Sequence, residues 1–198
     1  MNKYKIILIN SNELDLDNLL SSPFLNEEDI LRINRYKVEE TKKEKAVSTI
    51  LKRKYVGVFY LSENEKPLSD EKYFNIAHSK GMVAYVEDKN NPIGIDIELV
   101  RSSDESLRKY ISSDEEYDYI KNDINFYEIW TNKESLVKAY GSGIKDKIKE
   151  IPALPLNGIK EYKNIKYRSK NIKYLNYVIS VSVKSIEEFE IEIEQESL

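Results

Sequence analysis

The sequence of 198 residues has no cysteine, only one histidine, two methionines, five prolines and six glycines. Without cysteine the protein can form neither disulfide bonds nor thiolate metal sites, and a single histidine cannot build a histidine-based zinc site. The lack of thiols is typical of a reducing compartment, so we expect a cytoplasmic protein. No apolar run reaches the length needed to span a membrane, and the apolar run near the N-terminus is too short for a signal peptide.

Charged residues, in contrast, make up 33% of the chain, and they are unevenly distributed. The formal net charge of −4 argues against general affinity for nucleic acid. Residues 32–54 nevertheless contain nine basic and three acidic side chains, a local charge of +6. Such a segment is either an ordinary solvated helix face or a place where a phosphate-bearing ligand or an acidic partner binds.

The hydrophobic pattern predicts an α+β fold. We expect two α+β lobes of similar size, residues 1–100 and 101–198, packed in a pseudo-twofold arrangement with the active site at their interface. We also expect the strands over 82–86 and 93–97 to form a hairpin in one sheet with the strand before His78. The remaining strands are expected near 4–10, 162–167, 176–183 and 189–193, and the main helices near 26–36, 46–54 and 125–140.

The segment from Gly94 to Glu98 places two carboxylates on one face of a strand. Asp96 and Glu98 share that face, while Ile95 and Ile97 point to the other, which we expect to be the core. Neighbouring carboxylates repel each other unless a cation lies between them, and carboxylate oxygens suit Mg²⁺ or Mn²⁺. The alternative is a polar, solvent-facing edge of an ordinary strand.

A third carboxylate, Glu134, lies four residues before Lys138 on a predicted helix, so the two share a face. Glu134 could complete the ion site and leave Lys138 beside any phosphate that the ion holds. The alternative is an ordinary ion pair on a helix. Lys133 points about 140° away from Lys138 and is expected to matter less to chemistry. His78, at a predicted strand end, is either an anion ligand or a structural histidine.

Three segments in this order resemble the 4′-phosphopantetheinyl transferases of the long, Sfp-type branch. They are Asn75 to Gly81, Gly94 to Glu98, and Trp130 to Gly143. Lys66-Pro67 upstream and the segment from Ser113 to Tyr117 add to the resemblance, which spans residues 35–143. It implies transfer of phosphopantetheine from coenzyme A to a serine of an apo acyl or peptidyl carrier protein, with release of adenosine 3′,5′-bisphosphate.

The resemblance also implies a role for each matching residue. It implies a site for Mg²⁺, or Mn²⁺, with the ligands Asp96, Glu98 and Glu134. It implies that Lys138 assists the leaving phosphate, and that Glu116 or a metal-bound water accepts the serine proton. The residues implied to hold coenzyme A share contact with its phosphates or its adenine: Lys43, Lys66, Pro67, His78, Ser79 and Lys138.

The chain departs from the family pattern at Glu44, where the family commonly has a phosphate-binding arginine. Lys43, Lys45 or the earlier Arg32 and Arg35 would have to substitute for it. Glu65 replaces the family's glycine before Lys-Pro, and Ala77 replaces its usual serine before histidine. We expect both of these changes to be minor.

Three other functions remain compatible with parts of the sequence. A non-catalytic binder of coenzyme A or a nucleotide would have little use for a lysine beside three carboxylates. A metal-dependent phosphatase with two metal ions would need further ligands, which this sequence does not offer. The third alternative is a non-enzymatic scaffold protein whose carboxylates are ordinary surface residues. We expect a monomeric magnesium-dependent transferase, and the sequence leaves open whether its carrier serves fatty-acid, polyketide or nonribosomal peptide synthesis.

Overall fold

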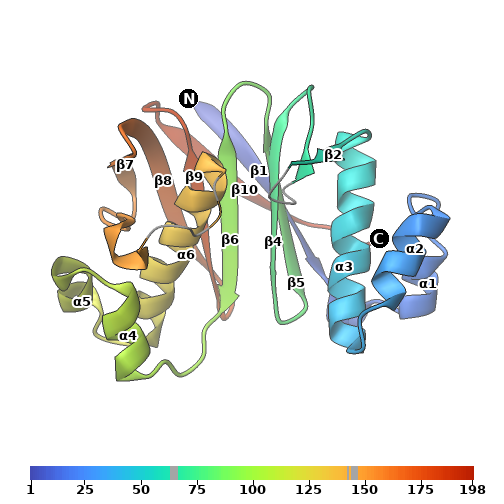
Figure 1. The fold of residues 1–198 in the computed structure, drawn as a ribbon, viewed down its shortest axis with the longest axis horizontal. Coiled ribbons are helices and arrows are strands. Elements are labelled where there is room, and N and C mark those ends of the chain that lie inside the picture. Colours follow the sequence, from blue (N-terminus) through green and yellow to red (C-terminus); the bar gives the residue numbers. More distant parts are fainter. Residues whose placement is uncertain (63–66, 142, 144–146) are drawn as a thin grey trace.

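Two four-stranded β-sheets face each other, and helices cover their outer surfaces (Figure 1). The computed structural model describes residues 1–62, 67–141, 143 and 147–198. The predicted α+β class is confirmed. No helix in these described ranges is both long enough and apolar enough to cross a membrane.

The first sheet has the strand order β10-β1-β5-β4. Strand β10 runs parallel to β1, and the other neighbours are antiparallel. Helix α3 covers the outer face of this sheet together with α1 and α2, through one apolar cluster. The bounds are β1 Asn2–Asn10, β4 Tyr73–Ser79, β5 Met82–Asp88, β10 Phe189–Gln195, α1 Leu16–Leu20, α2 Glu27–Asn34 and α3 Glu39–Leu51.

The second sheet is antiparallel and has the order β6-β9-β8-β7. The long helix α6 packs on its outer face, with α4 and α5 beside it (Figure 1). The bounds are β6 Ile93–Leu99, β7 Gly158–Tyr162, β8 Ile165–Tyr174, β9 Tyr177–Val183, α4 Glu105–Ile111, α5 Asp114–Tyr119 and α6 Asp123–Tyr140. The short elements are η1 Ser11–Glu13, η2 Lys52–Val56, η3 Ile148–Glu150 and the two-stranded ribbon of β2 Tyr60–Leu61 and β3 Pro67–Leu68.

The predicted hairpin of the strands over 82–86 and 93–97 is wrong. β5 already pairs with β1 and β4 on its two edges, so it has no free edge for β6. The chain instead crosses to the facing sheet, where β6 pairs with β9. Each sheet therefore contains one strand from the other half of the chain. β6, before residue 100, lies in the second sheet, and β10, after residue 100, lies in the first. The division into lobes 1–100 and 101–198, like their pseudo-twofold relation, stays a prediction.

The inner faces of the two sheets share one apolar core. Ile95 and Ile97 of β6 are fully buried there against residues of β1, β5 and β9, as their alternation predicts. The opposite face of β6 carries Gly94, Asp96 and Glu98. Burial of the isoleucines thus sets which way both carboxylates point.

Helix α6 packs very closely on β6 because Gly94 has no side chain. A Cβ atom at Gly94 would lie 2.1 Å from the carbonyl oxygen of Ser135 and 2.4 Å from the backbone nitrogen of Ala139. Small hydroxyl side chains line the adjoining contact with β9: Thr131 Oγ1 lies 2.8 Å from Ser180 Oγ, and Ser135 Oγ lies 2.8 Å from Ser182 Oγ. The last turn of α6 is therefore held directly over β6.

Gly94→Ala should push α6 away from β6, because the clash is with helix backbone that no change of rotamer can relieve. Overpacking of this kind costs about 1–3 kcal/mol of unfolding free energy. Chemical denaturation followed by circular dichroism measures the loss. An unchanged denaturation midpoint would contradict the close approach.

Candidate active site

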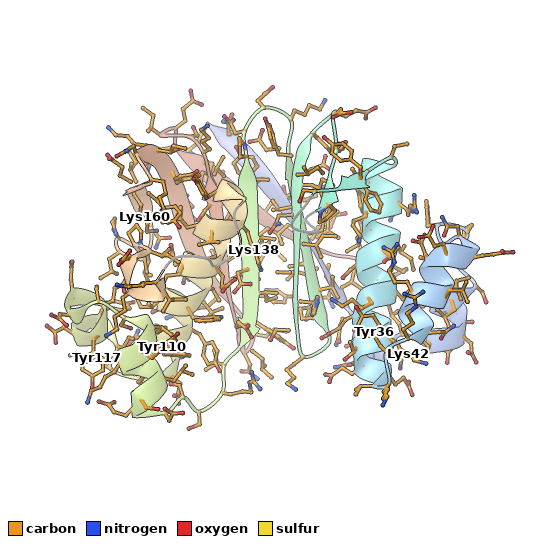
Figure 2. All side chains as sticks on the ribbon, in the orientation of Figure 1. Tyr36, Lys42, Tyr110, Tyr117, Lys138 and Lys160 are labelled. Carbon is orange, nitrogen blue, oxygen red and sulfur yellow. The ribbon has the colours of Figure 1, made fainter. Side chains whose placement is uncertain are left out.

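The contact between β6 and α6 brings the four predicted central residues together. Asp96 and Glu98 lie on the face of β6 that meets α6, and Glu134 and Lys138 lie one turn apart on that helix. The Lys138 ammonium donates a hydrogen bond of 2.6 Å to Asp96 Oδ1. Figure 2 shows Lys138 where α6 passes β6. Lys138 therefore lies on the side of α6 that faces Asp96, and its role there stays a prediction.

Burial dominates the electrostatics of these carboxylates. It raises the pKa of Asp96 to about 7; the Lys138 ammonium opposes this shift, and the negative charges of Glu134 and Glu98 add to it. Burial also raises the pKa of Glu134, with Lys138 opposing and Glu98 adding to the shift. The negative charge of Glu98 is thus close enough to affect the ionisation of both Asp96 and Glu134.

The donor set fits a hard divalent cation in its chemistry. All three candidate ligands are carboxylates, and Asp96 Oδ2 is buried without a hydrogen-bond partner among the described residues. Within the described ranges, however, no three such side chains form a preformed metal-binding group. The Lys138 ammonium supplies the positive charge beside Asp96 in this arrangement.

His78 and Ser79 are neighbours in the chain, but their side chains lie on opposite sides of β4. Ser79 Oγ donates to Glu98 Oε2 at 2.6 Å and accepts from the backbone N–H of Leu99 at 3.3 Å. It therefore ties the edge of the first sheet to the carboxylate strand. His78 instead faces α3, where Nδ1 lies 3.1 Å from Glu44 Oε2 and Nε2 lies 3.0 Å from Lys45 Nζ.

A basic pocket of about 380 Å³ lies between α2 and α3. Its lining residues include three bases, an aromatic ring and a proline: Arg32, Lys45, Lys52, Tyr36 and Pro67. Burial lowers the pKa of Lys52 to about 8, although the Asp29 carboxylate opposes the shift. Lys43 does not line this pocket and pairs with Glu39 Oε1 at 2.9 Å. Its expected role with coenzyme A stays a prediction.

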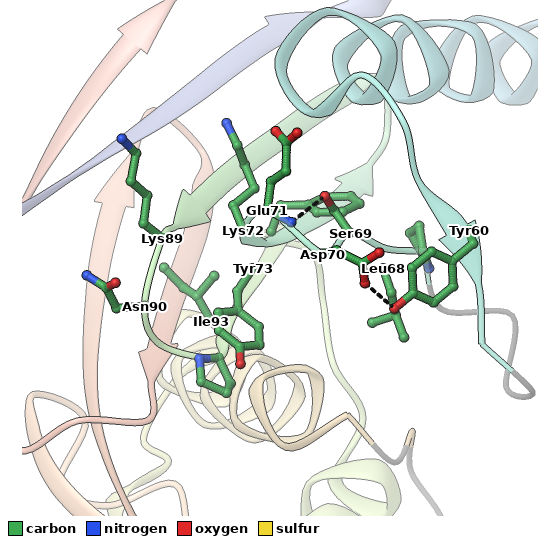
Figure 3. A pocket seen from close by; sticks show the side chains of 13 residues that line it. Tyr60, Leu68, Ser69, Asp70, Glu71, Lys72, Tyr73, Lys89, Asn90 and Ile93 are labelled. Atoms are coloured by element: carbon green, nitrogen blue, oxygen red, sulfur yellow. Dashed lines mark hydrogen bonds between the residues drawn. The ribbon is translucent and has the colours of Figure 1, made fainter.

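Pro67 also lines a second cavity, of about 530 Å³, between the β2–β3 ribbon and the turn after β5 (Figure 3). Tyr60, Tyr73 and Ile93 contribute to its wall, and the Tyr60 hydroxyl donates to Asp70 Oδ1 at 3.1 Å. None of the three carboxylates lines it. Lys66, expected at the adenine, lies outside the described residues.

Glu116, a candidate base, is held in a separate buried cluster. It accepts hydrogen bonds from the backbone N–H groups of Ser113 at 2.9 Å and Ala153 at 2.8 Å. Its Oε2 also lies 2.7 Å from Lys133 Nζ. No hydrogen bond or ion pair among the described residues joins Glu116 to Asp96, Glu98 or Glu134. Its assignment as base stays a prediction.

Two buried lysines escaped the sequence reasoning. Lys133 is fully buried, and besides Glu116 it donates to the carbonyls of Ile148 at 3.0 Å and Ile151 at 2.6 Å. Lys160, on β7 (Figure 2), donates to Asn132 Oδ1 at 2.5 Å, and burial lowers its pKa to about 7. Only the position of Lys133 on the apolar side of α6 could have signalled burial.

Comparison with known proteins supports the resemblance. Residues 92–189 match the model of the 4′-phosphopantetheinyl transferase superfamily. The chain is 34% identical over 94 residues to "4′-phosphopantetheinyl transferase gsp" of Aneurinibacillus migulanus, covering 44% of this chain and 39% of that protein. It is 28% identical over 151 residues to "4′-phosphopantetheinyl transferase HetI" of Nostoc, covering 64% and 63%, respectively.

A third relative is "4′-phosphopantetheinyl transferase Sfp" of Bacillus subtilis, 37% identical over 78 residues, with 36% of this chain and 34% of that protein covered. In each case the match spans less than two thirds of the relative's length. The region of the family match runs from Pro92 through β6 and α6 to Phe189. It contains Asp96, Glu98, Glu134 and Lys138. By this match, residues 92–189 form a region of the 4′-phosphopantetheinyl transferase superfamily type.

Proposed function

We propose that this protein transfers 4′-phosphopantetheine from coenzyme A to a serine of an apo acyl or peptidyl carrier protein, which is holo-[acyl-carrier-protein] synthase activity. The observation that carries the proposal is the Asp96–Lys138 contact beside Glu98 and Glu134, inside the superfamily region. The relatives' names support the same reaction. The products are the holo-carrier and adenosine 3′,5′-bisphosphate.

The reaction breaks a phosphorus–oxygen bond within the pyrophosphate of coenzyme A and forms one to the serine oxygen. Asp96, Glu98 and Glu134 would hold Mg²⁺ or Mn²⁺, which when bound would neutralise the charge of that pyrophosphate. Among the described residues Asp96 Oδ2 has no hydrogen-bond partner, so it can accept such an interaction without losing a hydrogen bond seen there.

The proposed role of Lys138 is to stabilise the negative charge that develops on the leaving group. Its ammonium is fixed by Asp96 Oδ1 in a partly buried position, so little reorganisation is needed when negative charge develops on the leaving phosphate oxygen. A preorganised cation of this kind stabilises the transition state more than the bound substrate.

We propose Glu116 as the acceptor of the serine proton, with a water held by the metal ion as the alternative. Glu116 would first have to lose its pairing with Lys133. The cytoplasmic location, the monomeric state and the identity of the carrier remain predictions.

The direct test is incubation with coenzyme A, Mg²⁺ and a panel of apo-carrier proteins, read by intact mass. A reactive carrier should gain one phosphopantetheine, and adenosine 3′,5′-bisphosphate should appear in equal amount. If protein that binds coenzyme A normally modifies no carrier in the panel, a non-catalytic binder becomes the better description.

Asp96→Asn should lower Mg²⁺-dependent transfer by about 10²-fold or more, because it removes a ligand charge while keeping the side-chain volume. Circular dichroism should show an unchanged fold. Asp88→Asn is the matched control, since Asp88 is also a largely buried aspartate but lies at the end of β5, away from the carboxylates. Near-full activity of Asp96→Asn would make the cluster structural.

Lys138→Ala and Lys133→Ala should fail in different ways. Lys138→Ala should lower kcat by about 10²-fold or more at saturating coenzyme A, with the fold retained. Lys133→Ala leaves Glu116 charged and unpaired in the interior, which should cost about 3–5 kcal/mol of unfolding free energy.

The double variant Lys133→Met, Glu116→Gln removes both buried charges and should recover much of that stability. Chemical denaturation and steady-state kinetics of all three variants give the contrast. A Lys133→Ala protein of wild-type stability would contradict the predicted cost of breaking the buried pair, and a larger loss of kcat there than in a folded Lys138→Ala would contradict the assignment of Lys138.

A further inference from the structure

We infer that Glu44 is a positioning residue whose carboxylate fixes the proton of His78 on Nδ1, so that Nε2 and the Lys45 ammonium together face a phosphate group of the substrate. The inference rests on the proposed function, because the phosphate belongs to coenzyme A. It assigns a role to the position at which this chain departs from its family's basic residue, and it makes Lys45 the base that replaces that residue.

The carboxylate of Glu44 is buried and held from two sides. Its Oε1 accepts the backbone N–H of Gly81 at 2.8 Å, and its Oε2 lies 3.1 Å from His78 Nδ1. Burial alone would raise the pKa of Glu44, but the hydrogen bonds from His78 and Gly81 outweigh it and lower that pKa. Glu44 is therefore a charged acceptor, which points away from a direct phosphate contact.

The neighbour on the other side of the imidazole favours the same position of the ring proton. Lys45 Nζ is 3.0 Å from His78 Nε2, and an ammonium group can only donate. This contact favours Nε2 as an acceptor, and the Glu44 carboxylate favours a proton on Nδ1 that is donated to it. A carboxylate that orients an imidazole through one nitrogen leaves the other nitrogen for the ligand.

The remaining surroundings of this pair are the Tyr36 ring, 5.9 Å from Lys45 Nζ, and Tyr177 of β9. The Tyr177 hydroxyl donates to the carbonyl of Lys80. Burial raises the pKa of Tyr177, and the negative charges of Glu40 and Glu44 add to the shift. Apart from Glu44, these contacts bring no acidic group against the exposed side of the imidazole.

Lys45 connects the imidazole to the basic pocket between α2 and α3, since its side chain lines that pocket with Arg32 and Lys52. Asp29 also lines this pocket, but its carboxylate is paired with Arg53. Three bases around one hollow, next to an imidazole nitrogen that accepts, suit a phosphate monoester. The second pKa of such a group is about 6, so one proton can be shared between a phosphate oxygen and Nε2. The Lys45 ammonium would then turn from Nε2 to a second phosphate oxygen.

His78 is the only histidine in the chain, so its tautomer can be read without assignment from a long-range ¹⁵N–¹H spectrum of uniformly labelled protein. Wild type should show the Nδ1–H form. In Glu44→Gln the amide oxygen can keep the Gly81 N–H, so the NH2 group faces Nδ1, and the Nδ1–H form should be depleted even though Lys45 still favours it. The KM for coenzyme A should rise about 10- to 100-fold, the worth of a charge-assisted hydrogen bond, while kcat stays within about twofold.

Two further variants separate positioning from general effects. Glu128→Gln removes another buried glutamate, hydrogen-bonded to Tyr119 and Asn125, and should change neither the tautomer nor the KM. Lys45→Gln should keep the Nδ1–H form, because Glu44 remains, and still raise the KM. It tests the inference even if Glu44→Gln does not fold.

A wild-type Nε2–H tautomer, an unchanged tautomer in Glu44→Gln, or an unchanged KM in Lys45→Gln would each overturn the inference while the transferase reaction stood. Failure of the proposed function looks different. In that case wild-type protein would hold the Nδ1–H form but modify no carrier. If calorimetry then also showed no binding of coenzyme A, the phosphate site would be overturned along with the reaction.

Discussion

The backbone of α6 rests on β6 without an intervening side chain at residue 94, and the candidate active site depends on that contact. A helix normally packs on a sheet at a distance set by its side chains. Here the closer approach brings Lys138 within hydrogen-bond distance of Asp96 and removes water from the carboxylates, which raises the pKa values of Asp96 and Glu134. Serine and threonine side chains fill the neighbouring space because larger ones would hold the helix away.

Local patterns were sufficient for the parts of this site that lie on one element. Alternation placed Ile95 and Ile97 in the core, and helical spacing placed Lys138 on the face of Glu134. The prediction of a hairpin between the strands over 82–86 and 93–97 was wrong. A short polar connection can either join two strands of one sheet or lead to a strand of the facing sheet. The choice depends on which edges other strands have already occupied.

Charged residues were the harder class to place, because their burial depends on partners far away in the sequence. Lys133 pairs with Glu116 and donates hydrogen bonds to the carbonyls of Ile148 and Ile151. None of these partners lies within a helical turn of Lys133 in the sequence. From the sequence, Glu44 stands where the family commonly has a phosphate-binding arginine, which suggests the loss of a phosphate contact. In the structure its side chain faces inward, to His78 and the backbone of Gly81. Sequence position alone cannot distinguish a carboxylate that repels a ligand from one that orients the residue beside it.

The parallel pairing of β10 with β1 joins segments nearly 190 residues apart, and it bears on how the chain is synthesised. On the ribosome, β1, β4 and β5 emerge early, but the edge of β1 stays unpaired until residues 189–195 have left the exit tunnel. At about 5–20 residues per second, that delay lasts on the order of ten seconds. An open edge beside the apolar run Ile6 to Ile9 is a site for pairing with another nascent chain, so slow translation or a truncated message should favour aggregation.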